Sequence, residues 1–166
     1  RSKFWAAVEA LSPLERLRPG DRVALFLFST EAEAVLPMGP PPEFTALKAT
    51  LRNVAPHGPT DIFPAIGAAF EAVASADVER KHVVLLSDGR SDATPDRAAS
   101  LAALGLLRAR RPDVTISVVA VGKNADEALL RELGKRHGFE VRVPEPYLAT
   151  GAPVSSTRIR NLVMRG

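Results

Sequence analysis

The chain of 166 residues contains no cysteine, which excludes disulfides, thiolate metal sites and cysteine nucleophiles. Aromatic residues make up only 5% of it, with one Trp and one Tyr, so few rings are available on which nucleobases could stack. No apolar run approaches the roughly 18 residues that a membrane-spanning helix requires. The sequence therefore predicts no membrane span, and it leaves the localisation unknown.

The motifs of common enzyme classes are also absent. The sequence contains no GxSxG elbow, HExxH pair, Walker A loop or GxGxxG turn. Its three histidines, His57, His82 and His137, show no metal-ligand spacing, and structural roles are predicted for all three. Hydrolase and dehydrogenase functions thus have no residues to support them, and we do not expect an enzyme.

Composition indicates one ordinary globular domain, with 46% hydrophobic and 25% charged residues. The net charge of +3 is uneven, because from residue 106 onward 11 Lys or Arg face 6 Asp or Glu. Several of these cations, however, end predicted helices, where they suit the helix dipole. We therefore do not expect the chain to bind nucleic acid.

Hydrophobic patterning predicts alternating helices and strands. The uninterrupted apolar runs at residues 23–28 and 83–86 are typical of strands buried on both faces of a parallel sheet. Residues 32–38 alternate and predict an antiparallel edge strand. Further strands are expected at 115–121 and 139–143. Helices are expected at 2–11, from Pro13 with Ser12 as its cap, at 43–52, from Pro64 through Val73, at 94–111 and from Asn124 to Gly138. This order predicts an α/β fold, a mostly parallel sheet with helices on both faces.

Two polar motifs stand at points where this fold would place its loops. GPTDI, residues 58–62, opens a helix, and Asp88 follows the strand VVLLS. Because the carboxyl ends of parallel strands share one edge, Thr60 and Asp88 should lie on neighbouring loops. Their hydroxyl and carboxylate oxygens are ligands that suit Mg²⁺ or Mn²⁺. Each motif also has a structural interpretation, with Thr60 and Asp61 as a helix cap and Asp88 as a strand-ending turn.

Over residues 1–138 the chain resembles the von Willebrand factor A (VWA) domain. The resemblance implies a three-layer Rossmann-like fold, a metal-ion-dependent adhesion site, and a protein ligand that binds through an acidic residue. The family's Thr and Asp metal ligands match Thr60 and Asp88. The matching segments are LRPGDRVALFLFST at 17–30, GPTDIFPAIGAAF at 58–70, VVLLSDGRSD at 83–92 and TISVVAVG at 115–122.

The chain departs from this family at the DxSxS motif of the first, central strand, which has no counterpart here. We therefore expect a fragment that begins after that strand, and weak or lost binding of Mg²⁺ or Mn²⁺. Auxiliary contacts to a metal or ligand are assigned to Ser29, Asp61, Ser91 and Asp92.

Loss of the central strand also has a consequence for strand pairing. Without it, strands 23–28 and 83–86 should pair directly or through a partner chain, because each buried unpaired amide costs about 1–3 kcal/mol. Dimerisation is thus an open alternative.

The last part of the chain, residues 139–166, resembles a different family. VSSTRIR at 154–160 is similar to the ISSTxIR end of the nucleotidyltransferase module in bacterial bifunctional riboflavin kinase/FAD synthetases. That resemblance implies contacts to ATP phosphates, although the family's HxGH-type motif is absent and transferase activity is not expected. A plain helix cap is the alternative, as is a chimera of two α/β families. The implied phosphate-binding residues are Ser155, Ser156, Thr157 and Arg160.

Two main hypotheses of function follow. The first is a VWA-like protein-interaction domain with a partial metal-ion-dependent adhesion site. The second is an ATP-binding fragment or chimera related to the adenylyltransferases. A folded chimera without activity is a third.

Overall fold

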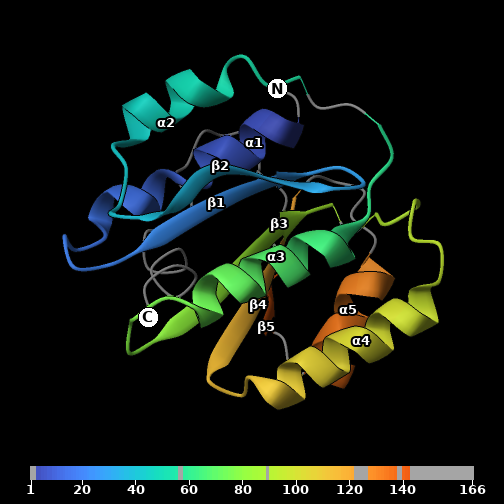
Figure 1. The fold of residues 1–166 in the computed structure, drawn as a ribbon. Coiled ribbons are helices and arrows are strands. Elements are labelled where there is room, and N and C mark those ends of the chain that lie inside the picture. The colour runs from blue at the N-terminus through green and yellow to red at the C-terminus, as the bar shows by residue number, and fades with distance from the viewer. Residues whose placement is uncertain (1–2, 56–57, 89, 122–126, 138–139, 143–166) are drawn as a thin grey trace.

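A hairpin lies beside a parallel sheet, with helices packed around both, in the computed structural model of the chain (Figure 1). The structure describes residues 3–55, 58–88, 90–121, 127–137 and 140–142.

The hairpin is formed by β1 (Val23–Phe28) and β2 (Ala32–Gly39), which pair antiparallel. Phe28 lies opposite Ala32, so the chain reverses within three residues. The pairing is irregular near Leu25, where the register shifts on both sides of that residue. The predicted antiparallel edge strand is therefore confirmed, and β1 has the bounds that its apolar run predicts.

The second sheet is parallel and has the order β3-β4-β5. In its first pair, Val83 lies opposite Ile116, and the ladder continues without a shift to the last residue of each strand. Both faces of β4 are covered, since six of its seven residues are buried. Parallel strands of this kind need helices on both faces, which explains their continuous apolar sequence. The strands are β3 (Lys81–Ser87), β4 (Val114–Ala120) and β5 (Glu140–Arg142).

The two sheets do not join through the strands that the sequence suggested would pair. Within the described residues, β1 has a ladder only with β2, and β3 has a ladder only with β4. Of the two arrangements expected from the sequence, direct pairing of β1 with β3 is therefore wrong, and pairing through a partner chain stays a prediction. Every residue of β1 is also half-buried, where burial on both faces was predicted, because one edge of this strand lacks a neighbouring strand in the described part of the chain.

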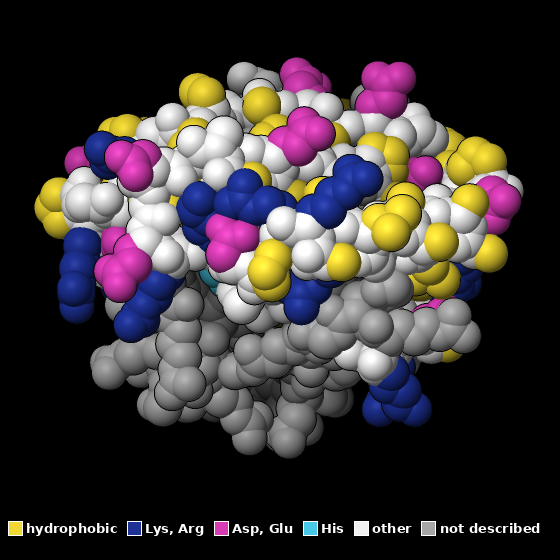
Figure 2. All heavy atoms as spheres, turned by 60° about the horizontal axis from the view of Figure 1, so that its bottom comes forward, with side chains coloured by type: hydrophobic (Ala, Val, Ile, Leu, Met, Phe, Trp, Pro, Cys, Tyr) yellow, Lys and Arg dark blue, Asp and Glu magenta, His cyan; other side chains and the backbone are white. Residues whose placement is uncertain are grey.

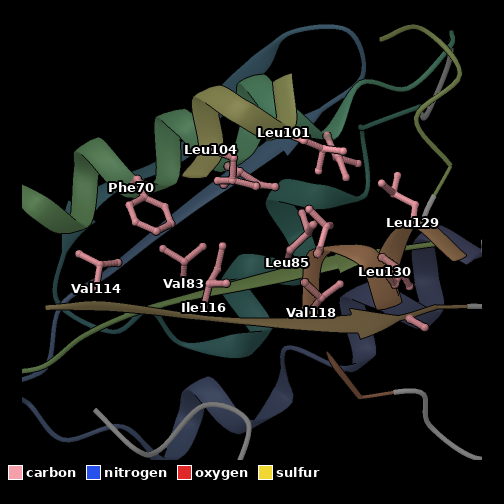
Figure 3. Packing of buried hydrophobic residues seen from close by; sticks show 14 residues of the cluster. Phe70, Val83, Leu85, Leu101, Leu104, Val114, Ile116, Val118, Leu129 and Leu130 are labelled. Carbon is pink, nitrogen blue, oxygen red and sulfur yellow. The ribbon is translucent and has the colours of Figure 1, made fainter. Parts of the chain in front are cut away.

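One helix, α3 (Ile62–Ala74), spans the junction between the sheets, because it packs against both β1 and β3 (Figure 1). Ile62, Ile66 and Phe70 form its buried stripe, at the spacing that a helix gives to one face. Figure 3 shows Phe70 from this helix above Val83 and Val114 of the parallel sheet.

The other helices divide between two apolar clusters. The cluster of β3 and β4 includes residues of α3, α4 and α5, with Leu101, Leu104, Leu129 and Leu130 visible in Figure 3. The cluster of the hairpin includes residues of α1, η1 and α2. These helices are α1 (Lys3–Glu9), the 3₁₀ helix η1 (Ser12–Arg16), α2 (Phe44–Leu51), α4 (Arg97–Arg110) and α5 (Glu127–His137).

The architecture agrees with the predicted α/β fold with a parallel sheet and helices on both faces. One detail is wrong: Ser12 does not cap a helix that begins at Pro13. Ser12 is instead the first residue of the 3₁₀ helix η1, and the residue at the N-cap position is Leu11, whose hydrocarbon side chain has no acceptor for a cap bond. The predicted cap at Asn124 and the segment 143–166 lie outside the described residues.

Candidate functional site

Asp61 organises the loop before α3. It is the N-cap of that helix, and its Oδ1 accepts a hydrogen bond from the backbone N–H of Phe63 at 3.1 Å. The same oxygen accepts a second bond from Thr94 Oγ1 at 2.9 Å. Only 8% of Asp61 is exposed, so its carboxylate needs these donors. Gly58, three residues earlier, has φ 82°, the left-handed conformation that favours glycine in a tight loop.

Ser91 attaches the loop after β3 to the same helix end. Its Oγ accepts from the N–H of Ile62 at 3.1 Å, which satisfies another of the amides that a helix leaves open at its N-terminus. It also lies 2.6 Å from Thr94 Oγ1 and 3.5 Å from Asp61 Oδ1. Ser91 and Thr94 therefore attach the loop after β3 to the Asp61 carboxylate and to the N-terminus of α3.

Thr60 is held by two backbone contacts with the loop after β3. Its N–H donates to Asp92 Oδ1 at 3.1 Å, and its carbonyl accepts from the N–H of Ala93 at 3.0 Å. The loop after β1 reaches the same place, since the carbonyl of Ser29 accepts from the N–H of Asp61 at 2.7 Å. Three loops thus meet at one edge, and we call this surface, formed by residues 29, 60–61, 88 and 90–94, the loop edge.

Asp88 lies on the loop edge and binds a cation of the chain itself. Its Oδ2 is 2.9 Å from Lys3 Nζ, and its Oδ1 accepts from the N–H of Arg90 at 3.2 Å. The side chain of Asp88 is 22% exposed and that of Lys3 is 51% exposed. Sequence reasoning missed Lys3, because no spacing rule relates residues that stand 85 positions apart.

The residues at the loop edge do not by themselves fit a divalent metal. Among the described residues, no three or more His, Cys, Asp or Glu side chains are grouped so that they could hold one. Both oxygens of Asp88 already accept from donors, and one oxygen each of Asp61 and Asp92 accepts from a backbone amide. Mg²⁺ takes about six oxygen ligands in near-octahedral geometry, which this arrangement does not provide.

Other titratable groups lie at the opposite ends of the strands. His82 is the second residue of β3, and its Nδ1 lies 2.6 Å from Thr115 Oγ1, which suits a structural role. Arg111 and Asp113 form an ion pair at 2.6 Å just before β4. The hydrogen bond from Arg111 lowers the pKa of Asp113 to about 2, and Asp113 in turn raises the pKa of Arg111. His57, the side chain of His137 and the VSSTRIR segment lie outside what the structure describes.

The surface charges of the described residues are mixed. On the face shown in Figure 2, Lys and Arg side chains stand among Asp and Glu side chains. A nucleic-acid-binding domain is typically marked by one basic patch or stripe, which this face does not present among its described residues. No helix in the described part of the chain is both long and apolar enough to cross a bilayer.

Comparison with known proteins gives one family match. The family model of the von Willebrand factor type A domain matches residues 4–146. No curated protein sequence matches the chain.

Solved structures similar to this chain include three bacterial proteins. A von Willebrand factor type A protein from Catenulispora acidiphila has a TM-score of 0.73 at 21% identity, over 87% of this chain and 35% of its own. An aerotolerance-related membrane protein from Bacteroides fragilis NCTC 9343 has a TM-score of 0.67 at 16% identity, over 94% of this chain and 84% of its own. The conserved hypothetical protein BatB from Bacteroides thetaiotaomicron has a TM-score of 0.66 at 14% identity, over 95% of this chain and 83% of its own. At these identities the similarity concerns the fold.

Proposed function

Since the chain belongs to the von Willebrand factor type A domain family, we propose that it binds another protein through the loop edge. Domains of this family are in general not enzymes, and they mediate protein interactions. In an open α/β sheet, ligands bind outside the carboxyl ends of the strands, and the loop edge lies at that position for β1 and β3.

The observation that carries this proposal is the attachment of the loop after β3 to the N-terminus of α3. Ser91 and Asp92 accept hydrogen bonds from the backbone at the start of α3, and Thr94 donates one to Asp61. A surface loop fixed in this way loses little conformational freedom when a partner binds, so less binding energy is spent on ordering it. Loops held rigidly on a scaffold are also where binding residues concentrate.

The loop edge presents polar groups of both signs to a partner. Arg90 and Asp92 are exposed, while Thr60 and Asp88 are half-buried and accessible. Lys3, whose side chain is half-exposed, borders this surface. A partner with an acidic side chain could bind to Lys3 or Arg90 by a charge-assisted hydrogen bond.

Site-directed crosslinking tests the proposal. A photo-crosslinking amino acid at Arg90 should attach a partner protein from the source cell, whereas the same amino acid at exposed Arg110, at the far end of α4, should not. The variant Asp92→Ala, which removes an exposed carboxylate from the loop edge, should reduce the crosslinked product. Equal crosslinking at both positions, or none at Arg90, would contradict binding through the loop edge.

The alternative of ATP binding has no structural observation in its favour. Its residues, from Ser155 to Arg160, lie outside the described part of the chain. None of the three similar structures named above is described as a nucleotidyltransferase.

A further inference from the structure

Asp88 is the carboxylate that the resemblance to the VWA domain assigns as a metal ligand. The positive charge beside this carboxylate is the ammonium group of Lys3. We propose that the ammonium group of Lys3 replaces the divalent cation at Asp88, so that the charge of this carboxylate is balanced and its loop is ordered without metal. The proposal concerns the cation at Asp88 and holds whether or not the loop edge binds a partner protein.

The geometry at Asp88 is that of a satisfied carboxylate. Lys3 Nζ lies 2.9 Å from Oδ2 and the N–H of Arg90 lies 3.2 Å from Oδ1, so each oxygen has its own donor. The bond from Lys3 joins two ionised groups and is therefore of the stronger, charge-assisted kind. A divalent ion at Asp88 would have to displace the ammonium group or lie beside it, and like charges at that distance repel.

The position of Lys3 follows from how α1 is anchored. Lys3 is the first residue of this helix, and Val8, five residues later, is only 2% exposed in the hairpin cluster. Phe4 and Trp5 pack against the same cluster, with their rings edge to face at 5.8 Å between centroids. The helix therefore holds the start of the Lys3 side chain in place. About half of that side chain is exposed, so the pair lies at the surface and avoids most of the cost of desolvating two buried charges.

The neighbouring acidic groups are already committed to the fold. Asp61 caps α3 and accepts from Thr94, and Asp92 accepts from the N–H of Thr60. Recruiting either of them to a metal would release backbone amides of the α3 loop. Among the described residues of the loop edge, Asp88 is then the one carboxylate that does not fix the α3 loop, and the charge of Lys3 balances its charge.

The proposal is tested by the binding of Mn²⁺, measured as the enhancement of water proton relaxation by the bound ion. The wild-type chain should give the same signal as Asp88→Asn. In Lys3→Met, which keeps most of the aliphatic stem but removes the charge, the apparent affinity for Mn²⁺ should rise about tenfold or more, because a unit positive charge no longer repels the ion. Lys3→Arg should remain like wild type, since it keeps the charge.

Thermal melts with Mn²⁺ or with EDTA give a second readout on the same variants. Near saturation of Lys3→Met, Mn²⁺ should raise the melting midpoint of this variant by about 5 to 10 °C and that of wild type by a clearly smaller amount. Lys48→Ala is the matched control, because it removes another lysine from an exposed ion pair, with Glu9, and should stay indifferent to metal.

Two results would overturn the proposal. The first is Mn²⁺ binding by the wild-type chain that Asp88→Asn abolishes, which would show that the ammonium does not exclude the ion. The second is equal Mn²⁺ affinity of Lys3→Met and wild type, which would show that Lys3 has no part in excluding it. If Lys3→Met did not fold, the comparison of wild type with Asp88→Asn would still decide the first point, and Lys3→Gln would replace Lys3→Met for the second.

Discussion

Asp61 and Thr94, 33 positions apart in sequence, are joined by a hydrogen bond of 2.9 Å from the threonine hydroxyl to the carboxylate. The bond connects the start of α3 to the loop that leads into α4. Because Asp61 is buried and also caps α3, this one contact couples the order of two loops to the stability of the helix between the sheets.

Asp61→Ala should lower the free energy of unfolding by about 2–3 kcal/mol, because it removes a helix cap and leaves Thr94 without its acceptor. Urea denaturation measures this loss. The matched control is Asp96→Ala, which removes the cap of α4, where Asp96 accepts from the N–H of Ala99 at an exposed site. That change should cost only about 1 kcal/mol. Equal costs for the two variants would contradict the central role of Asp61.

Ser91 and Thr94 should be energetically coupled. Each contacts the other at 2.6 Å, and both contact Asp61. In a double-mutant cycle of Ser91→Ala and Thr94→Ala, the effects on unfolding should deviate from additivity by about 0.5 kcal/mol or more. The pair Ser91 and Ser75 serves as control, because Ser75 bonds to carbonyls at the other end of α3. Additive effects in both cycles would mean that Ser91 and Thr94 do not act together on Asp61.

Phe70→Ala should cost about 3–5 kcal/mol, since it empties a fully buried position between α3 and the parallel sheet. Domains of this kind have only about 5–15 kcal/mol of stability, so much of the chain should be unfolded at moderate temperature. Circular dichroism melts measure the effect. Leu106→Ala, at a residue that is 62% exposed, should change stability by less than about 0.5 kcal/mol. Similar midpoints for the two variants would show that Phe70 does not fill a buried position between α3 and the parallel sheet.

The ion pair of Arg111 and Asp113 predicts a dependence on pH. Its hydrogen bond lowers the pKa of Asp113 to about 2 from 3.8, so the folded state holds the proton less tightly than the unfolded state. The pair therefore stabilises the fold above the unfolded pKa and loses this effect as the pH falls toward about 2. In melts, the difference in midpoint between wild type and Asp113→Asn should shrink over that interval.

Salt provides a control for this pH effect. Both groups are at the surface, so about 1 M salt should reduce the difference between wild type and Asp113→Asn even at neutral pH. A difference that depended on neither pH nor salt would assign the effect to something other than the ion pair.

The parts of the fold that sequence predicts well are those whose signal is local. The run of apolar residues at 23–28 marks β1 to the residue, and Asp96 caps α4 where the pattern of Thr94, Pro95 and Asp96 indicates. The stripe of Ile66 and Phe70 is likewise a property of neighbouring turns of one helix.

The features that sequence does not predict depend on distant segments. The half-burial of β1 differs from the burial that its apolar run predicts, because the burial of a strand depends on its neighbours in the sheet, and β1 has a ladder on one side only in the described part of the chain. The role of Ser91 as an auxiliary contact for a metal or ligand stays a prediction, but the hydrogen bond that its hydroxyl accepts from the N–H of Ile62 could not be predicted, because only the folded loop brings the two together. The contact of Lys3 with Asp88 has the same origin.

The edge of β1 that faces away from β2 has a consequence for how the chain behaves at high concentration. In the described part of the chain this strand has a ladder on one side only, and its six residues, VALFLF, contain no charge, proline or glycine. Segments of that composition on an open edge are templates for cross-β stacking between molecules. Within the described residues, the strand that closes the hairpin cluster thus combines an uncharged apolar sequence with an edge that has no ladder, and this combination favours stacking between molecules.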